Sequence, residues 1–353
     1  MRFLLALFLF TTAQLVVADC PSLAKGTIHW IVPSKPGGGY DAYSRLLQPF
    51  MEQQLDARIV IENRFEAGGI VAAMAIRDAP ADGTTLGIIN APGLLTANMM
   101  AKGPAPNPET DFTVLGRVAG THVVMFTGRD SGISTLVELM QTSRTQPILV
   151  GVRDAGSSNF ITLPITASLI GMDYELVTGY TGNTARTMAA LRSEIDIVFH
   201  NIDSARRYVA AEELIPLLQI TDPSTRALND VSRILLAGVP ILAGNQGFAQ
   251  RQAVVTGKAP EQAEEEAAAL SRIFDAGRIV VAPRDLPESL ASCLGSALTH
   301  VLHSDELLGA AKQAHLIIDY QDREAVLEGL STATRELGQF EPLILSAIDR
   351  ARR

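Results

Sequence analysis

One stretch decides the fold of this chain: Val32-Pro33-Ser34-Lys35-Pro36-Gly37-Gly38-Gly39-Tyr40-Asp41. It follows a short apolar run and precedes a segment with helical apolar spacing, so it reads as a strand end, a glycine loop and a helix start. Glycines let the backbone adopt positive φ and approach a ligand closely, and a helix start presents unpaired N–H groups and a positive dipole end. The stretch therefore predicts an anion-binding turn built from backbone.

The helix behind this turn is expected to be capped by Asp41, or by Gly39 just before it. Its buried face is marked by apolar residues at helical spacing: Leu46, Leu47, Phe50, Met51 and Leu55. Pro49 predicts a kink or an early end, because a proline inside a helix costs about 3 kcal/mol.

Composition describes an exported, folded protein. With 353 residues, 47% hydrophobic and 19% charged, the chain has enough apolar sequence for two domains. Residues 1–18 have the basic start, apolar block and cleavage pattern of a secretory signal, so the mature chain is expected to begin after Ala18. A lipoprotein start at Cys20 is the rival interpretation, but Asp19 stands where that motif needs a small residue.

The net charge limits the classes of binding partner, and the cysteine content predicts a disulfide. Losing Arg2 with the signal changes the net charge from −9 to −10, which argues against nucleic acid and anionic membranes and leaves small molecules or proteins. No later apolar run reaches the roughly 20 residues that cross a bilayer. Cys20 and Cys293 are the only cysteines, and an even pair in an oxidising compartment predicts a disulfide.

From Thr27 onward the chain repeats a short β-rich run, a polar or glycine loop and an amphipathic stretch. This alternation predicts an α/β fold of mostly parallel sheets flanked by helices, with the loops at the strand ends converging on one cleft. The segment 256–277 is expected to be a surface helix with a solvated acidic face, Ser134 to cap the helix that ends near Ser143, and Leu316–Tyr320 to form a strand.

Several further motifs follow the glycine loop in order: Glu62-Asn63-Arg64, Ala67-Gly68-Gly69, Asp82-Gly83-Thr84-Thr85-Leu86, Gly179-Tyr180-Thr181-Gly182 and Ala282-Pro283. Each is weak alone, and a single glycine turn is often only a turn. Together, in this order, they resemble the Bug-type substrate-binding proteins of tripartite tricarboxylate transporters. The likeness covers nearly all of the chain after the signal.

The resemblance implies a two-lobed periplasmic-binding-protein fold of type II. We expect lobe 1 to combine residues 19–122 with 241–353, and lobe 2 to be residues 123–240. The cleft between them would hold a ligand carboxylate through loop backbone and ordered water.

The residues expected to line this cleft come from the first strand–helix loop, its counterpart in the second lobe and nearby loop ends. They are Ser34, Lys35, Pro36, Gly37, Gly38, Tyr40, Asp41, Asn90, Arg153, Ser157, Ser158, Asn159, Tyr180, Gly182, Asn183, Asn201 and Asp203. Lys35 and Arg153 are either solvated charges or contacts to the anion.

Other chemistries fit the sequence less well. Asp41 and Asp82 stand at positions where aspartate caps backbone rather than transfers protons. His300 and His303 are spaced for one helix face, but no third metal ligand stands nearby. His200 fits cleft lining and core packing equally. Ser157 and Ser158 lack a nucleophile elbow, and the glycine loop lacks the Lys-Ser/Thr of a nucleotide-binding loop.

The sequence thus predicts a periplasmic receptor that binds a small carboxylate and delivers it to membrane permease subunits. It is expected to be monomeric and to use no cofactor, no metal and no covalent chemistry. An exported sensory receptor and an exported enzyme that uses the same cleft are the alternatives.

Overall fold

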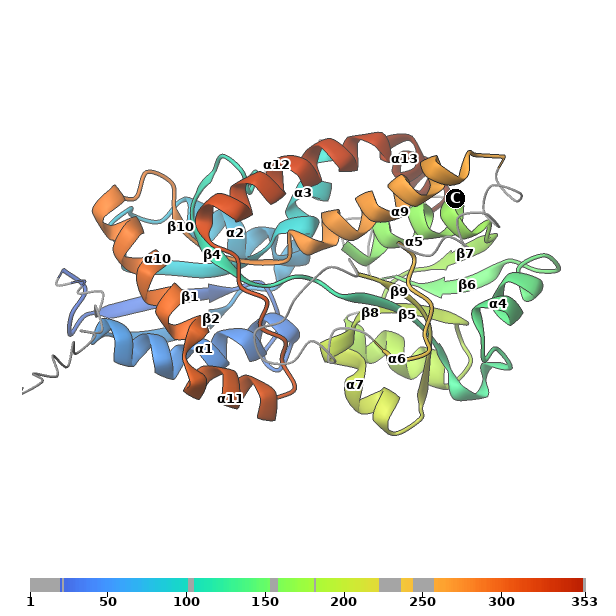
Figure 1. The fold of residues 1–353 in the computed structure, drawn as a ribbon, viewed down its shortest axis with the longest axis horizontal. Helices are drawn as coiled ribbons and strands as arrows, with labels where there is room; N and C mark the ends of the chain where they lie inside the picture. The colour runs from blue at the N-terminus through green and yellow to red at the C-terminus, as the bar shows by residue number, and fades with distance from the viewer. Residues whose placement is uncertain are drawn as a thin grey trace, which may run out of the picture.

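The structure is a computed structural model that describes residues 20, 22–100, 105–152, 158–180, 182–221, 236–243 and 257–351. In these ranges the chain forms two five-stranded sheets, each flanked by helices, which lie side by side along the long axis of the molecule (Figure 1). The predicted α/β class with two lobes is confirmed. The proposed signal, residues 1–18 with its cleavage site, lies outside the described residues.

The first sheet has the strand order β2-β1-β3-β10-β4. Its strands are β1 (Thr27–Val32), β2 (Arg58–Asn63), β3 (Thr85–Asn90), β4 (Phe112–Ala119) and β10 (Arg278–Pro283). Strand β1 pairs in parallel with β2 and β3, whereas β10 runs antiparallel to both β3 and β4.

The second sheet has the order β7-β6-β8-β5-β9 and repeats this topology. Its strands are β5 (Val123–Gly128), β6 (Ile148–Gly151), β7 (Tyr174–Val177), β8 (Ile197–Asn201) and β9 (Leu214–Ile220). Strand β5 is antiparallel to its neighbours β8 and β9. Both antiparallel strands, β5 and β10, follow the passage of the chain from one sheet to the other, so they enter their sheet from the junction. The βα rhythm alone does not reveal that reversal.

Helices cover the sheets and the junction between them. The described helices are α1 (Gly39–Leu55), α2 (Ile70–Arg77), α3 (Ala91–Met99), α4 (Leu136–Thr142), α5 (Ser158–Ile170), α6 (Asn183–Leu191), α7 (Ile202–Ala210), α9 (Pro260–Asp275), α10 (Glu288–His303), α11 (Asp305–Gln313), α12 (Arg323–Gln339) and α13 (Glu341–Ala351), with the short 3₁₀ turns Glu66–Gly69 and Arg129–Ser131. None of them is long and apolar enough to span a bilayer.

Helix α1 buries Leu47, Met51 and Leu55 against the first sheet. The predicted early end at Pro49 is wrong, because the helix continues to Leu55. Pro49 lies on the exposed side, and the apolar face opposite holds the helix in place despite the lost backbone hydrogen bond.

Three local predictions need correction. The predicted surface helix is α9, and it does expose acidic side chains, but Leu270, Ile273 and Phe274 on its other face are buried in a core that runs from the first sheet into the second. Residues Leu316–Tyr320 form no strand, but an extended segment whose Ile317 packs into the core of the second sheet. The cap of α4 is Thr135, in a capping box with Glu138, rather than Ser134.

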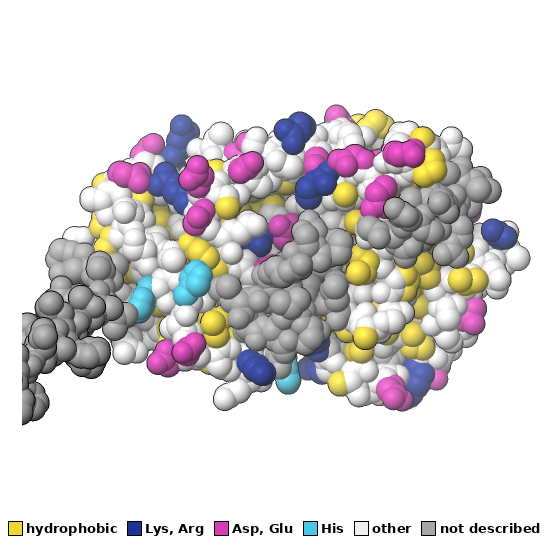
Figure 2. All heavy atoms as spheres, in the orientation of Figure 1, with side chains coloured by type: hydrophobic (Ala, Val, Ile, Leu, Met, Phe, Trp, Pro, Cys, Tyr) yellow, Lys and Arg dark blue, Asp and Glu magenta, His cyan; other side chains and the backbone are white. Residues whose placement is uncertain are grey.

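The outer surface carries mixed charge. Acidic side chains gather along the edge formed by α9 and α12, with basic side chains among them (Figure 2). On this edge Arg272 binds Glu265 and Glu336 at 2.6 Å each. The Glu265 side chain is 68% exposed, and an exposed pair of this kind contributes little to stability.

Cys20 and Cys293 form a disulfide with their Cα atoms 5.9 Å apart. The bond attaches the first described residue to α10 across a sequence separation of 273 residues. Both residues contact the core beneath β1, Cys20 as a buried member.

Replacing Cys20 and Cys293 by alanine should lower the free energy of unfolding by about 3 to 5 kcal/mol, because a long covalent loop restricts the unfolded chain. Guanidinium unfolding of oxidised wild type and variant measures the difference. Adding reductant should destabilise only the wild type. Equal unfolding midpoints for the two oxidised proteins would contradict the prediction.

Candidate functional site at the junction of the two sheets

The loop between β1 and α1 is organised by the carboxylate of Asp41, which is 2% exposed. It accepts hydrogen bonds from the Gly37 N–H at 2.8 Å, from Asn63 Nδ2 at 2.9 Å and from Arg45 Nε at 2.9 Å. The N-cap position of α1 belongs to Gly38, not to Asp41 or Gly39 as predicted. Asp41 therefore lies inside the first turn of α1, and its carboxylate holds the loop in place through the Gly37 N–H and the Asn63 amide.

Burial acts to raise the pKa of Asp41, but the hydrogen bonds from Arg45, Gly37 and Asn63 outweigh it and hold the pKa below its ordinary value. The charged carboxylate is thus the form that the loop is built around. Asn63, from the predicted Glu-Asn-Arg motif, also donates to the Ser34 carbonyl at 2.8 Å, so the end of β2 is tied to the same loop.

The N–H groups of this loop differ in whether they already have a partner. The Gly37 N–H is bonded to Asp41, the Gly38 N–H donates to the Lys35 carbonyl at 2.9 Å, and the Asp41 N–H donates to Ser34 Oγ at 3.2 Å. The N–H groups of Gly39 and Tyr40 have no hydrogen-bond partner among the described residues. They form the open donor pair at the start of α1.

The start of α7 lies opposite the start of α1. Asn201 caps α7 by accepting from the Asp203 N–H at 3.2 Å. A Cβ placed on Gly39 would meet Ser204 Oγ of α7 at 3.6 Å. Two helix N-termini, one beside each sheet, therefore face each other at the junction, and both favour negative charge between them.

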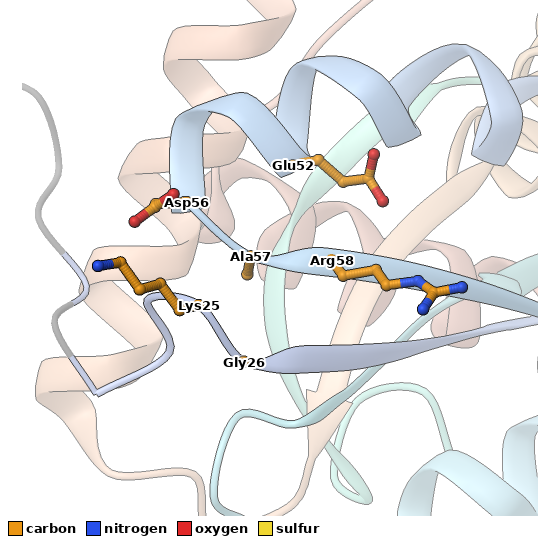
Figure 3. A pocket seen from close by; sticks show the side chains of 6 residues that line it. All are labelled: Lys25, Gly26, Glu52, Asp56, Ala57 and Arg58. Carbon is orange, nitrogen blue, oxygen red and sulfur yellow. The ribbon is translucent and has the colours of Figure 1, made fainter.

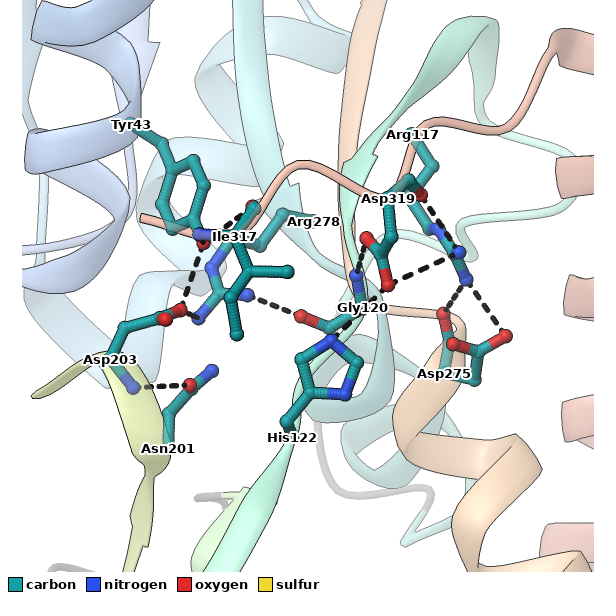
Figure 4. Close-up of polar contacts among 10 residues, drawn as sticks. All are labelled: Tyr43, Arg117, Gly120, His122, Asn201, Asp203, Asp275, Arg278, Ile317 and Asp319. Atoms are coloured by element: carbon teal, nitrogen blue, oxygen red, sulfur yellow. Dashed lines mark hydrogen bonds and ion pairs between the residues drawn. The ribbon is translucent and has the colours of Figure 1, made fainter. Parts of the chain in front are cut away.

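A buried polar network lies beside the starts of α1 and α7 (Figure 4). The Tyr43 hydroxyl lies 2.8 Å from Asp203 Oδ2 and 2.9 Å from the Ile317 carbonyl, so one proton serves two acceptors. The Arg278 guanidinium lies 4.6 Å from the Tyr43 ring centroid and 5.5 Å from that of Tyr40, and donates to the Gly120 carbonyl. Residues from α1, α7 and β10 thus meet directly.

The network continues toward α9 and α12. Arg117 of β4 binds the Asp275 carboxylate at 2.8 Å and the Asp319 carbonyl at 2.9 Å. Asp319 also accepts from the Gly120 N–H at 2.7 Å and lies 3.2 Å from His122 Nε2. These contacts join the short passage between β4 and β5 to the extended segment before α12.

Burial affects the pKa values of two tyrosines and one aspartate in this network. It raises the pKa of Tyr40 to about 12, against the lowering effect of Arg278 and Thr121. It also raises the pKa of Tyr43, with the negative charge of Asp203 adding to the effect. For Asp319, burial alone would raise the pKa, but Arg117 and His122 hold it below its ordinary value. Both hydroxyls are therefore donors at neutral pH.

Sequence reasoning placed Asp203 and Asn201 at this junction but missed Tyr43, Arg117, His122, Asp275, Arg278 and Asp319. A signal for two of them was present: Arg117 and Arg278 interrupt otherwise apolar strands, and both are 3% exposed. A buried arginine needs buried partners. The partners come from distant segments, so the sequence did not name them.

The remaining predicted residues lie in several places. Asn90 caps α3 and accepts from the Gly93 N–H at 3.3 Å. Gly182 precedes α6 in extended backbone, Asn183 accepts a hydrogen bond from Arg186, and Tyr180 packs against the core of the second sheet. Arg153 and Ser157 lie outside the described residues, as do the side chains of Ser158 and Asn159 at the start of α5.

Lys35 and the described histidines show little sign of a ligand role. Lys35 is exposed, with its ammonium 5.0 Å from the Phe65 ring centroid, and Pro36 is exposed beside it. His200 is buried, bonded to Thr187 Oγ1 at 2.9 Å, and burial lowers its pKa well below the ordinary value, with Arg186 adding to the effect. Among the described residues, no three His, Cys, Asp or Glu side chains lie together in a way that could hold a metal ion. This also applies to the two histidines of α10, His300 and His303.

A separate hollow lies far from the junction, at the start of β1 and β2 (Figure 3). It is lined by Lys25, Gly26, Glu52, Asp56, Ala57 and Arg58. It opens widely to solvent, and charges of both signs ring it, so it is an uneven part of the surface rather than an enclosed site.

Two sheets of identical strand order, with facing helix starts between them, define a two-lobed solute-binding fold. The sequence model of the tripartite tricarboxylate transporter family receptor matches residues 43–245. The chain belongs to this family, as its motifs predicted.

Known relatives agree at modest identity. The chain is 25% identical over 188 residues to the UPF0065 protein in the tcbD-tcbE intergenic region of Pseudomonas sp., an alignment that covers 53% of this chain and 56% of that protein. It is 26% identical over 145 residues to protein BugT of Bordetella pertussis, covering 40% and 44%. The chain therefore spans about half the length of these curated relatives.

Solved structures share the fold. Rpa4515 of R. palustris, solved with adipate, superposes with a TM-score of 0.71 at 20% identity, covering 93% of this chain and 98% of that one. MatC of Rhodopseudomonas palustris, solved with malate, gives 0.66 at 21% identity, covering 90% and 99%. The periplasmic binding protein BugD gives 0.69 at 17% identity, covering 90% and 98%.

Changing Asp41 to Asn should cost about 1 to 3 kcal/mol of stability at neutral pH, because a charged acceptor of three hydrogen bonds is lost. The folded-state pKa lies below the unfolded value of about 3.9, so this stability is complete above that value and is lost as pH falls through the folded pKa.

Urea unfolding of wild type and variant between about pH 3 and pH 7 measures this effect. The gap between the two proteins should shrink as the solution becomes acidic. Asp285→Asn, at a side chain that is 87% exposed, is the control and should match wild type at neutral pH. A gap that stays constant down to the lowest pH would contradict the assignment.

Proposed function

We propose that this protein is a periplasmic receptor that captures a small carboxylate between its two lobes and delivers it to the permease subunits of a tripartite transporter. One observation carries the proposal: the N–H groups of Gly39 and Tyr40 have no partner in the part of the chain that the structure describes, and the start of α1 that carries them lies beside the start of α7. Such a pair of helix starts is an anion site that needs no cationic side chain.

The composition of the junction supports a ligand held by backbone. Lys35 is exposed, with its ammonium over the Phe65 ring, so the proposed backbone site does not depend on its charge. The donors instead come from a loop that Asp41 holds rigid, and rigid donors bind without a large ordering cost. Structures solved with adipate and with malate share the fold and show which probes to try first.

The proposed motion follows from the two crossings. Lobe 1 comprises residues 19–122 with 241–353, and lobe 2 residues 123–240, with α13 reaching across to pack on α5. The passage from β4 to β5 is short, and the Tyr43–Asp203 contact spans the lobes. The lobes would open by breaking that contact and close on the ligand, which is the usual hinge motion of two-lobed receptors.

The proposal also covers export, the oligomeric state and the other loops of the cleft. Residues 1–18 direct export and are removed after Ala18, and the receptor works as a monomer. The cleft takes in the predicted loops, including Arg153 and the stretch Ser157 to Asn159 on the side of lobe 2. Membership of a receptor family supports the transport role.

Replacing Gly39 with valine should weaken carboxylate binding by about 100-fold or more, which equals about 2.7 kcal/mol. The new side chain would contact Ser204 of α7 and so take up space between the two helix starts. Isothermal titration with adipate and malate measures the change, and circular dichroism checks the fold.

The matched control is Gly309→Val in α11, where an added Cβ meets no atom within 4 Å. This variant should bind as wild type does. If folded Gly39→Val binds as tightly as the control, the start of α1 is not the anion site.

A further inference from the structure

The chain between α11 and α12 runs alongside β4 as an extended segment (Figure 1). We call its residues Leu316–Gln321 the strap. The Asp319 N–H of the strap donates to the Val118 carbonyl of β4 at 3.2 Å. Arg117 of β4 and Gln321 exchange two N–H to carbonyl hydrogen bonds, at 2.9 and 3.3 Å. Because β4 is the edge strand of the first sheet, the strap is attached to lobe 1 much as an added strand would be.

Consecutive side chains of the strap lie in different lobes. Neighbouring side chains of an extended chain point in opposite directions. Leu316 and Ile318 are buried in the core beneath the first sheet, with residues of α1 and α10. Ile317, between them, is 0% exposed and packs in a core of the second sheet with Val124 and Phe126 of β5. The strap therefore inserts one apolar side chain into lobe 2.

The backbone of Ile317 is nevertheless attached to lobe 1. The Tyr43 hydroxyl of α1 donates to the Ile317 carbonyl at 2.9 Å, and the Ile317 N–H donates to the same hydroxyl oxygen at 3.2 Å. Figure 4 shows this pair beside the junction. Two residues further on, Asp319 accepts from the Gly120 N–H at 2.7 Å, in the passage between β4 and β5. Only the side chain of Ile317 thus reaches into the core of lobe 2.

These contacts determine what a separation of the lobes must break. The hydrogen bonds to β4 and α1 keep the strap with lobe 1 when lobe 2 rotates away. The Ile317 side chain would then leave a core that β5 and α7 help to build, and water would contact it. Exposing a buried isoleucine is unfavourable enough to lower the ratio of separated to joined lobes by about tenfold or more.

We infer that the strap sets the balance between joined and separated lobes, with Ile317 as the residue that holds lobe 2 against lobe 1 when no ligand is present. The inference uses the hinge motion of the proposed function but concerns the ligand-free protein, so each can fail separately. Its effect on binding is indirect. When the joined arrangement is the one that binds, a larger population of it raises the apparent affinity, although Ile317 touches no ligand.

Double electron–electron resonance on residues 19–353, unfolded and refolded under oxidising conditions to remove any retained ligand, measures the separation of the lobes. Spin labels are attached to genetically encoded keto residues at Glu306 of α11 and Ala210 of α7, so the disulfide stays intact. Both positions are exposed, and they lie in different lobes. In Ile317→Ala the ratio of separated to joined molecules should be about tenfold or more higher than in wild type. A folded variant with the wild-type distance distribution would overturn the inference.

The matched control is Ile318→Ala. Ile318 is also 0% exposed, but its side chain packs within lobe 1. Urea unfolding should show that both variants are folded and less stable than wild type, whereas only Ile317→Ala should change the distances. Equal changes in the two variants would leave Ile317 a general packing role and would also refute the inference.

A smaller deletion covers the case in which Ile317→Ala does not fold. Ile317→Val removes one methylene group and should raise the ratio of separated to joined molecules by about threefold. Ile318→Val is its control and should keep the wild-type distribution. An unchanged distribution in Ile317→Val would count against the strap in the same way.

Discussion

Charges buried between the two sheets must be compensated, and this requirement governs how the molecule is assembled. Arg117 and Arg278 start or interrupt strands of the first sheet, and their partners come from α9, from the passage between β4 and β5, and from the segment before α12. Losing one member of a buried set leaves its partner unpaired, which is costly. The junction is therefore held by contacts that form only when all these segments are in place.

The glycine loop is a second element that fixes the geometry of the junction between the two sheets. Asp41 fixes the loop and so fixes where α1 begins and where the Gly39 and Tyr40 N–H groups point. Tyr43, one turn further along α1, reaches Asp203 on the other side. The position of the donors and the contact between lobes thus depend on one helix, which explains why binding and closure would be coupled.

Much of the fold was predictable from the sequence because local signals carry it. The glycine loop, the βα rhythm and the ordered motifs led to an α/β protein with two lobes, and the structure has that class. The antiparallel strands β5 and β10 were missed because strand direction depends on which sheet the chain enters. Helix α9 was misjudged because its acidic face is real, but its other face packs between α12 and α5.

Only the parts of the candidate site that consist of backbone groups and helix caps could be predicted from the sequence. Glycines and caps can be read from the sequence, so the Ser34–Asp41 loop, Asn201 and Asp203 were named. The sequence did not reveal which N–H groups of the loop already have partners, because the hydrogen bonds from Gly37 to Asp41 and from Gly38 to Lys35 are visible only in three dimensions. The partners of the buried arginines come from segments far apart in the chain, and no local pattern points to them.

The central claim is that a ligand carboxylate binds the free N–H groups at the start of α1. Amide NMR of ¹⁵N-labelled, deuterated protein during titration with a bound acid tests it most directly. The account predicts large shifts for the Gly39 and Tyr40 amides and small shifts for Gly37 and Gly38, whose N–H groups already have partners. Large shifts at Gly37 and Gly38 with Gly39 and Tyr40 unmoved would contradict it.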